Sequence, residues 1–138
     1  MGGNARNESA YLSGPDQRHR FPRSARLLRH ADFDQVYKKG RRHFSALMTV
    51  FFLPREQDGG MRVGFTVGKV LGGAVVRNRM KRRLREAVRL EGLRSNLAVD
   101  VVINPKKSLL TAEFPELRKE VGRAFQVIEQ KLAEKRNP

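Results

Sequence analysis

The segment Val75–Arg89, VVRNRMKRRLREAVR, constrains the fold most, because nearly half of its residues are Arg or Lys. At about 100° per residue, a helix here carries an apolar stripe and an opposite cationic face. The stripe consists of Met80, Leu84, Ala87 and Val88. The opposite side consists of Asn78, Lys81, Arg82, Arg85 and Arg89, flanked by Arg79. The pattern predicts an amphipathic helix whose stripe packs on a core.

The cationic face of this helix needs a partner outside the chain. Like charges one turn apart repel each other, and only Glu86 lies close enough to offset them. A solvated surface helix is the simple alternative, but solvated faces usually mix both signs of charge. The whole chain has a formal net charge of +15, from 29 basic and 14 acidic residues. This excess indicates a polyanionic partner, with nucleic acid as the leading candidate.

Length and composition limit the other possibilities. The 138 residues, 39% of them hydrophobic, fit one folded domain, which we expect over residues 21–135. Residues 1–20 have almost nothing to bury, and we expect a flexible tail there. The absence of cysteine excludes disulfides, thiolate zinc sites and cysteine nucleophiles. No apolar run approaches the roughly 20 residues that span a bilayer, so we expect a cytoplasmic protein without a membrane partner.

Two further helices are predicted. From Arg29, the pattern RHADFDQVYKKG places Phe33, Val36 and Tyr37 on one face and ends at Gly40. A final helix is predicted from about Thr111 to Lys135, with Thr111 as its possible N-cap. Its apolar stripe consists of Phe114, Leu117, Val121, Phe125, Ile128 and Leu132.

Three strands are predicted between these helices. Ser45–Leu53 and Met61–Gly68 are joined by PREQDGG, whose Pro and paired Gly favour a hairpin. Ala98–Ile103 is rich in β-branched residues and follows the basic helix. The order α-β-β-α-β-α predicts an α+β fold, a small mixed β-sheet with helices packed against it.

One face of this sheet is predicted to be open. In the second strand, Arg62, Gly64, Thr66 and Gly68 alternate with four apolar residues. In the first strand, Phe51 and Phe52 point to opposite faces, and Thr49 shares its face with Phe51. We therefore expect an aromatic ring on the open face.

Residues suited to protein-based catalysis are few. His19, His30 and His43 lack metal-ligand spacing, and no carboxylate pair is spaced for a metal-dependent nuclease. Gly72 and Gly73 could approach a phosphate, but the rest of a phosphate-binding loop is missing, so we interpret them as a flexible turn. We predict no catalytic residues and no metal ligands.

The run VGFTVGKVLGGAVVRNRMKRRLREAVR resembles the protein subunit of bacterial ribonuclease P. The signature is a Gly-x-Ser/Thr-Val-x-Lys strand end, a short turn and an Arg-Asn-Arg-x-x-Lys/Arg helix. The resemblance extends to FPRSARLLRHADFDQVYKKG and DVVINPK, over roughly residues 21–125. It implies a left-handed crossover through the basic helix, against the usual right-handed rule.

The resemblance also implies a function and its site residues. In that family a large RNA cuts the 5′ leader from precursor tRNA with Mg²⁺, which the RNA mainly holds, and the basic protein binds that RNA and the leader. No obligate protein partner is evident in the sequence. The residues that would bind the catalytic RNA are Lys69, Arg77, Asn78, Arg79, Lys81, Arg82 and Arg85. Those that would bind the leader are Phe33, Tyr37, Thr49, Phe51 and Thr66. Unpaired nucleotides stack on aromatic rings, whereas structured RNA is held through phosphate and 2′-OH contacts.

Three alternatives stay open at this point. Phe33 and Tyr37, and less readily Phe51, could simply pack in the core. The chain could be a basic protein of another RNA assembly, such as a ribosomal protein. It could also be a self-sufficient nuclease, although clustered His or carboxylate residues are absent from the sequence.

Overall fold

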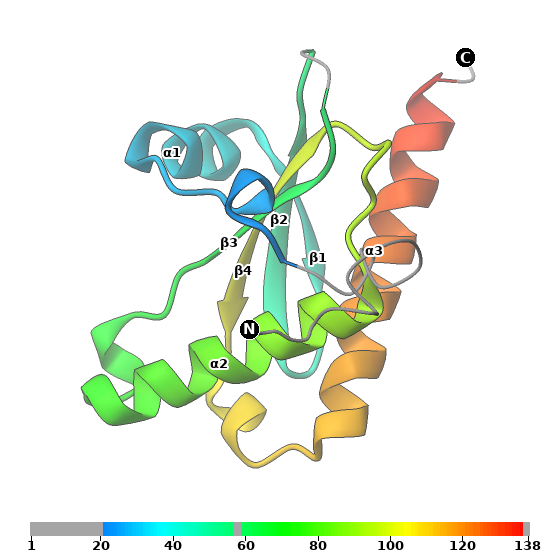
Figure 1. The fold of residues 1–138 in the computed structure, drawn as a ribbon. Coiled ribbons are helices and arrows are strands. Elements are labelled where there is room, and N and C mark those ends of the chain that lie inside the picture. Colours follow the sequence, from blue (N-terminus) through cyan, green and yellow to red (C-terminus); the bar gives the residue numbers. More distant parts are fainter. Residues whose placement is uncertain (1–20, 57–58, 137–138) are drawn as a thin grey trace, which may run out of the picture.

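The computed structural model describes residues 21–56 and 59–136 (Figure 1). The predicted tail, residues 1–20, lies outside the described residues. The elements follow the chain in the order η2 (Arg23–Ala25), α1 (His30–Lys39), β1 (Arg41–Phe44), β2 (Met48–Pro54), β3 (Arg62–Phe65), η3 (Lys69–Leu71), α2 (Ala74–Glu91), β4 (Val99–Pro105), η4 (Lys107–Leu110) and α3 (Phe114–Arg136). This order confirms the α+β class, with β1 as an additional strand before β2.

Within this part of the chain, no helix is long and apolar enough to cross a membrane.

The sheet is mixed, with strand order β1-β2-β4-β3. The pairs β1–β2 and β2–β4 are antiparallel, whereas β3 and β4 are parallel. The predicted hairpin of residues 45–53 with residues 61–68 is therefore wrong, because β4 lies between those strands. The burial of β4 gives the reason: Val101 and Val102 are both fully buried although they point to opposite faces. A strand that is apolar on both faces is stable only in the interior of a sheet that is covered on both sides.

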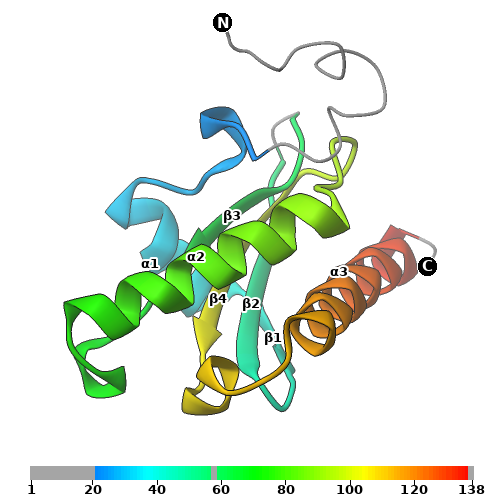
Figure 2. The same cartoon turned by 60° about the horizontal axis from the view of Figure 1, so that its bottom comes forward.

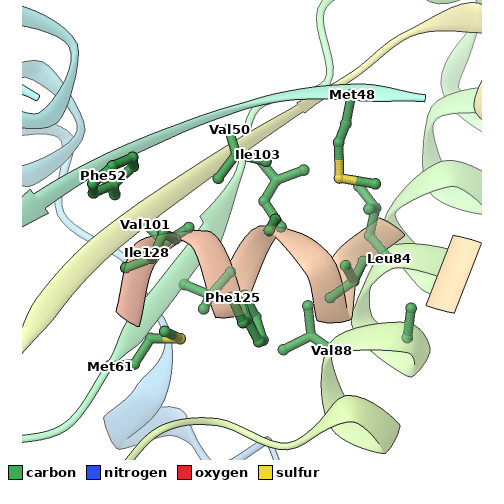
Figure 3. Packing of buried hydrophobic residues seen from close by; sticks show 14 of the residues in the cluster. Met48, Val50, Phe52, Met61, Leu84, Val88, Val101, Ile103, Phe125 and Ile128 are labelled. Atoms are coloured by element: carbon green, nitrogen blue, oxygen red, sulfur yellow. The ribbon is translucent and has the colours of Figure 1, made fainter. Parts of the chain in front are cut away.

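Helices cover the two faces of this sheet unequally (Figures 1 and 2). Helices α2 and α3 pack on one face and enclose the main core (Figure 3). The sheet contributes Val50, Phe52, Val101 and Ile103, α2 contributes Met80, Leu84, Ala87 and Val88, and α3 contributes Leu117, Val121, Phe125, Ile128 and Leu132. Burying each large side chain of this kind contributes about 1.5–3 kcal/mol. Helix α1 packs on the opposite face through a smaller cluster of Leu27, Val36 and Val102.

The connection from β3 through α2 to β4 is left-handed. In Figure 2 both strands run toward the lower left, β4 lies below and to the right of β3, and α2 passes in front of the sheet. Nearly all parallel crossovers have the opposite hand. The hand expected from the family resemblance is thus confirmed.

The helix boundaries are close to those predicted. Helix α1 has Asp32 in its first turn, Lys38 and Lys39 in its last turn, and Gly40 at its C-cap. Helix α2 begins one residue before Val75 and ends two residues after Arg89. Helix α3 begins at Phe114. Its predicted N-cap, Thr111, instead ends η4 and is its C-cap, because the chain makes a 3-10 turn before α3.

The sheet face that we predicted to be open is covered in part. Gly64 is buried beneath α1, and Arg62 is half-buried, whereas Thr66 and Gly68 are exposed. A Cβ atom at Gly64 would lie 2.5 Å from Cζ of Phe33. Glycine at this position lets α1 approach the sheet closely, so the open surface begins only beyond α1.

Candidate nucleic-acid interface

The cationic face of α2 is the larger candidate surface. The four residues of the predicted stripe are all buried, which confirms the orientation of the helix. On the other side, Asn78, Arg79, Arg82 and Arg85 are exposed, and Lys81 is half-buried. Among the described residues, no carboxylate pairs with the cations at positions 69, 77, 79, 81, 82 or 85. This surface is therefore available to a polyanion.

The N-terminal end of α2 continues the positive surface. Gly73 is the N-cap, and the first turn contains no acidic residue, so the positive end of the helix dipole is not offset. Gly72 has φ 145°, a conformation that favours glycine, and its carbonyl accepts a hydrogen bond of 3.1 Å from Nε of Arg77. Lys69 is exposed in the preceding η3 turn. The glycine pair is thus a defined turn that sets where the helix begins.

Besides Arg77, two further arginines of α2 have structural partners. Arg83 donates hydrogen bonds to the carbonyls of Leu109, Leu110 and Ala112, at 2.8, 3.0 and 2.6 Å. Arg89 pairs with Glu86, and their hydrogen bond holds the pKa of Glu86 below its usual value. The helical pattern in the sequence placed Arg82 on the cationic face and left Arg83 out of it; the position of Arg83 beside the apolar stripe is the signal that separates these neighbours.

The second candidate surface lies on the other face of the sheet, where α1 meets β2. The rings of Tyr37 and Phe51 pack edge to face with their centroids 4.9 Å apart. The guanidinium of Arg42 lies 5.4 Å from the centroid of Phe51. Both rings are half-buried. One edge of this aromatic pair is therefore accessible, and a cation lies beside it.

Polar groups border the aromatic pair. The hydroxyl of Tyr37 lies 2.7 Å from Oγ1 of Thr66 and 2.9 Å from Oδ1 of Asn104. Thr49 pairs with Asn104 across β2 and β4, so the two side chains share a face. The structure thus brings together four of the five residues predicted to bind the leader: Tyr37, Thr49, Phe51 and Thr66. Asn104 was not predicted; its alternation with the buried Val101 and Ile103, which places it on the opposite face of β4, was the available signal.

Phe33 has a more structural position. Its ring covers Gly64 and packs with Leu27, so it helps to fix α1 on the sheet. The ring is half-buried, and part of it faces solvent. The spacing of Phe33 left open that it simply packs in the core. Most of the contacts of its ring are of this kind, with the smaller cluster beneath α1.

A buried ionic network fixes the other end of α1. Asp100 in β4 is 5% exposed and accepts two hydrogen bonds from Arg62, of 2.8 and 2.7 Å, and one of 2.7 Å from Arg55. The hydrogen bond to Asp100 raises the pKa of Arg62. Arg62 also lies 3.7 Å from the carboxylate of Asp32 in α1. The network links β3, β4 and α1, and so fixes one side of the aromatic surface.

Comparisons with known proteins agree on one family. The family model described as Ribonuclease P matches residues 21–129. The chain is 42% identical over 101 residues to the ribonuclease P protein component of Symbiobacterium thermophilum, covering 73% of this chain and 88% of the relative. It is 37% identical over 113 residues to that of Citrifermentans bemidjiense, covering 82% and 96%.

Solved structures of the same kind share the fold. A mutant RNase P protein from Staphylococcus aureus superimposes with a TM-score of 0.67 at 25% identity, over 76% of this chain and 88% of that one. The RNase P protein from Thermotoga maritima gives a TM-score of 0.59 at 27% identity, over 70% and 90%. Both comparisons cover at least 70% of this chain and show that it shares the fold of these proteins.

Proposed function

The chain belongs to the bacterial ribonuclease P protein family, and we therefore propose that it is the RNA-binding subunit of this endoribonuclease. It holds a catalytic RNA together with the 5′ leader of precursor tRNA and promotes removal of that leader in the cytoplasm. The mature 5′ end of the tRNA is the product.

The cationic face of α2 is the observation that carries this proposal. Apart from Arg89, which pairs with Glu86, its cationic side chains have no acidic partners among the described residues, and a folded RNA supplies phosphates that can neutralise them. Six side chains are proposed to contact the catalytic RNA through charge, namely Lys69, Arg77, Arg79, Lys81, Arg82 and Arg85, with Asn78 as a hydrogen-bonding neighbour. The RNA would neutralise the repulsion that these charges otherwise impose on the helix.

The aromatic surface is proposed to hold the leader. Tyr37 and Phe51 would stack on unpaired bases, Thr49 and Thr66 would contact the strand, and Phe33 would support the site from α1. Stacking on a ring contributes about 1–3 kcal/mol per base and tolerates any sequence. Such tolerance suits a protein that processes many different precursors.

Catalysis is proposed to reside in the RNA. In the part of the chain that the structure describes, no three His, Asp or Glu side chains gather in a group that could hold a metal ion. The described residues therefore assemble no group of this kind for Mg²⁺, and we propose that the RNA mainly holds the Mg²⁺. The side chains of this protein bind and orient the RNAs.

Reconstitution tests the proposal. The purified protein is mixed with a bacterial ribonuclease P RNA, and leader removal from a precursor tRNA is followed at low Mg²⁺, beside RNA-only and protein-only reactions. We expect the protein to be inert alone and to restore cleavage by the RNA. Cleavage by the protein alone would indicate a nuclease, and no stimulation would indicate another RNA assembly.

The leader site is tested with a variant that keeps its packing. Phe51→Leu retains an apolar side chain against Tyr37 but removes the ring, so we expect weaker binding of precursor tRNA and unchanged binding of mature tRNA, which has no leader. Leu53→Ala, in the same cluster beneath α1, is the matched control for lost packing. An equal loss for both tRNAs would mean that Phe51 serves only the core.

A further inference from the structure

Phe44, at the end of edge strand β1, exposes 64% of its surface. An isolated exposed apolar side chain is ordinary and needs no explanation. Phe44 is not isolated, because its strand pairing places it beside the candidate leader site. Cross-strand partners in an antiparallel pair point to the same face, and Phe44 pairs with Thr49.

The register extends this row across the sheet. Thr49 pairs with Asn104 of β4, and the amide of Thr66 donates a 3.0 Å hydrogen bond to Ile103, next to Asn104. Phe44, Thr49 and Asn104 therefore form one line across β1, β2 and β4, which Thr66 continues just after the end of β3, directly beyond the part of the face that α1 covers. Strands lie about 4.8 Å apart, so Phe44 and Asn104, two strands apart, are separated by about 10 Å. A nucleotide base fits over Thr49 between them.

Hydrogen bonding leaves part of Asn104 free. Its Oδ1 atom accepts from the Tyr37 hydroxyl, while its NH₂ group has no hydrogen-bond partner among the described residues. An amide NH₂ group can donate to the acceptors on a base edge. The ring of Phe44, which can stack on a base, and the amide of Asn104, which can donate a hydrogen bond, thus lie on either side of Thr49.

Positive charge continues along β1 from Phe44 back toward the end of α1. Arg42 lies two residues before Phe44 on the same face, with its guanidinium over Phe51. Lys38 and Lys39, at the end of α1, are exposed. An apolar ring with cations along the same edge of the sheet is complementary to a polyanion with stacking bases, that is, to single-stranded RNA.

We propose that Arg42, Phe44 and Asn104 form a further nucleotide subsite, which extends the leader-binding surface to the β1 edge of the sheet. One unpaired base stacks on Phe44, Arg42 pairs with a neighbouring phosphate, and the Asn104 amide donates to the base edge. The base stack adds affinity, and the Asn104 contact adds a base preference at one leader position. This subsite rests on the proposed function, since its ligand is the leader.

The test uses the holoenzyme, reconstituted with a bacterial ribonuclease P RNA, and measures affinity for precursor tRNAs whose leaders are shortened one nucleotide at a time. Phe44→Ala is expected to lower the affinity for precursors with long leaders about fivefold or more, because fivefold corresponds to the weakest stacking of a base on a ring. The affinity for mature tRNA should not change. Phe44→Trp is expected to restore affinity. Phe44→Ala and Phe51→Leu are expected to lose their effects at different leader lengths, because they contact different nucleotides.

Arg41 provides a matched control for Arg42. The two arginines are neighbours in β1, but Arg41 pairs with Phe52 and points to the opposite face. Arg42→Ala is expected to weaken precursor binding, whereas Arg41→Ala is not. In the unmodified protein, one hydrogen bond from Asn104 should make the affinity for precursor tRNA differ about two- to tenfold among the four bases at the leader position that contacts Phe44. Asn104→Val is expected to reduce these differences in affinity.

The outcomes separate this subsite from the proposed function. If Phe51→Leu weakens precursor binding while Phe44→Ala does not, the leader site stands and the subsite is refuted. Identical leader-length dependence for both variants would also refute a separate subsite. If the unmodified holoenzyme binds precursor and mature tRNA alike, leader binding itself fails, and the subsite fails with it.

Discussion

Arg82 and Arg83 are adjacent in α2, and we predict opposite consequences for their replacement by alanine. Arg82 is exposed on the cationic face, whereas Arg83 holds three carbonyl groups of the segment between β4 and α3. The Arg82→Ala variant should lose RNA affinity and keep its stability. The Arg83→Ala variant should lose stability and keep the electrostatic part of its RNA affinity.

The magnitude for Arg82 follows from counterion release. Each neutralised phosphate contributes about 0.7–0.9 to the slope of log K against log salt concentration, so the six proposed cationic contacts give roughly −4 to −5. Losing one contact should make the slope shallower by about 0.7–0.9. For Arg83, carbonyls left without a donor should lower the free energy of unfolding by about 1–3 kcal/mol.

Two measurements test this pair. Binding of each variant to the catalytic RNA is titrated at several salt concentrations, and unfolding by urea gives its stability. A slope that is unchanged in Arg82→Ala but shallower in Arg83→Ala would refute the assignment of the two side chains. A salt-independent affinity of the unmodified protein would refute the electrostatic account of the whole face.

Three further predictions concern stability and use urea unfolding followed by circular dichroism. Asp100→Ala leaves Arg55 and Arg62 without their shared buried partner and should lower the free energy of unfolding by about 3–5 kcal/mol. Asp34→Ala removes an exposed ion pair with His30 and should change that free energy by less than about 1 kcal/mol. Equal effects of the two substitutions would contradict the network. Gly64→Ala places a Cβ atom against the Phe33 ring and should cost about 1–3 kcal/mol, and a neutral result would mean that α1 shifts freely on the sheet. Burial lowers the pKa of His43, and the positive charges of Arg123 and Lys131 lower it further, whereas the charge of Glu120 acts in the opposite direction. As the pH falls below about 6.5, the unfolded chain therefore binds a proton at this histidine before the folded chain does. The free energy of unfolding should decline in that range, and His43→Gln should reduce the decline.

The sequence predicted the helices better than the pairing of the strands. The buried stripe of α2 could be identified residue by residue, because helical periodicity fixes which side chains share a face. Strand neighbours are set by contacts between distant segments. The turn residues before Met61 favoured a hairpin, but the burial of Val101 and Val102 requires β4 to lie between β2 and β3. Strand β1 was missed because RRHF has little of the composition typical of strands.

The candidate site was predictable to a similar extent. Alternation in β2 placed Phe51 and Thr49 on one face, opposite Phe52, as the structure has them, although both are half-buried there. Alternation does not say which helix covers that face or how far. For this reason Gly64 was assigned to the open surface although it lies beneath Phe33, and Asn104 was overlooked although it contacts Tyr37. The separate roles of Arg82 and Arg83 depend on the position of the segment after β4, which follows α2 in the chain.

The central position of β4 also bears on how this protein is synthesised. Translation delivers β2 and β3 before β4, and neither of them has its main partner until residue 105 has left the ribosome. Their hydrogen-bonding edges and the apolar stripe of α2 stay unprotected during that interval, which is a state prone to aggregation. The main core then closes only when α3, the last helix of the described chain, covers it. The nascent chain should therefore fold late and in one concerted step, and ribosome-bound fragments that end before residue 99 should be sensitive to proteases.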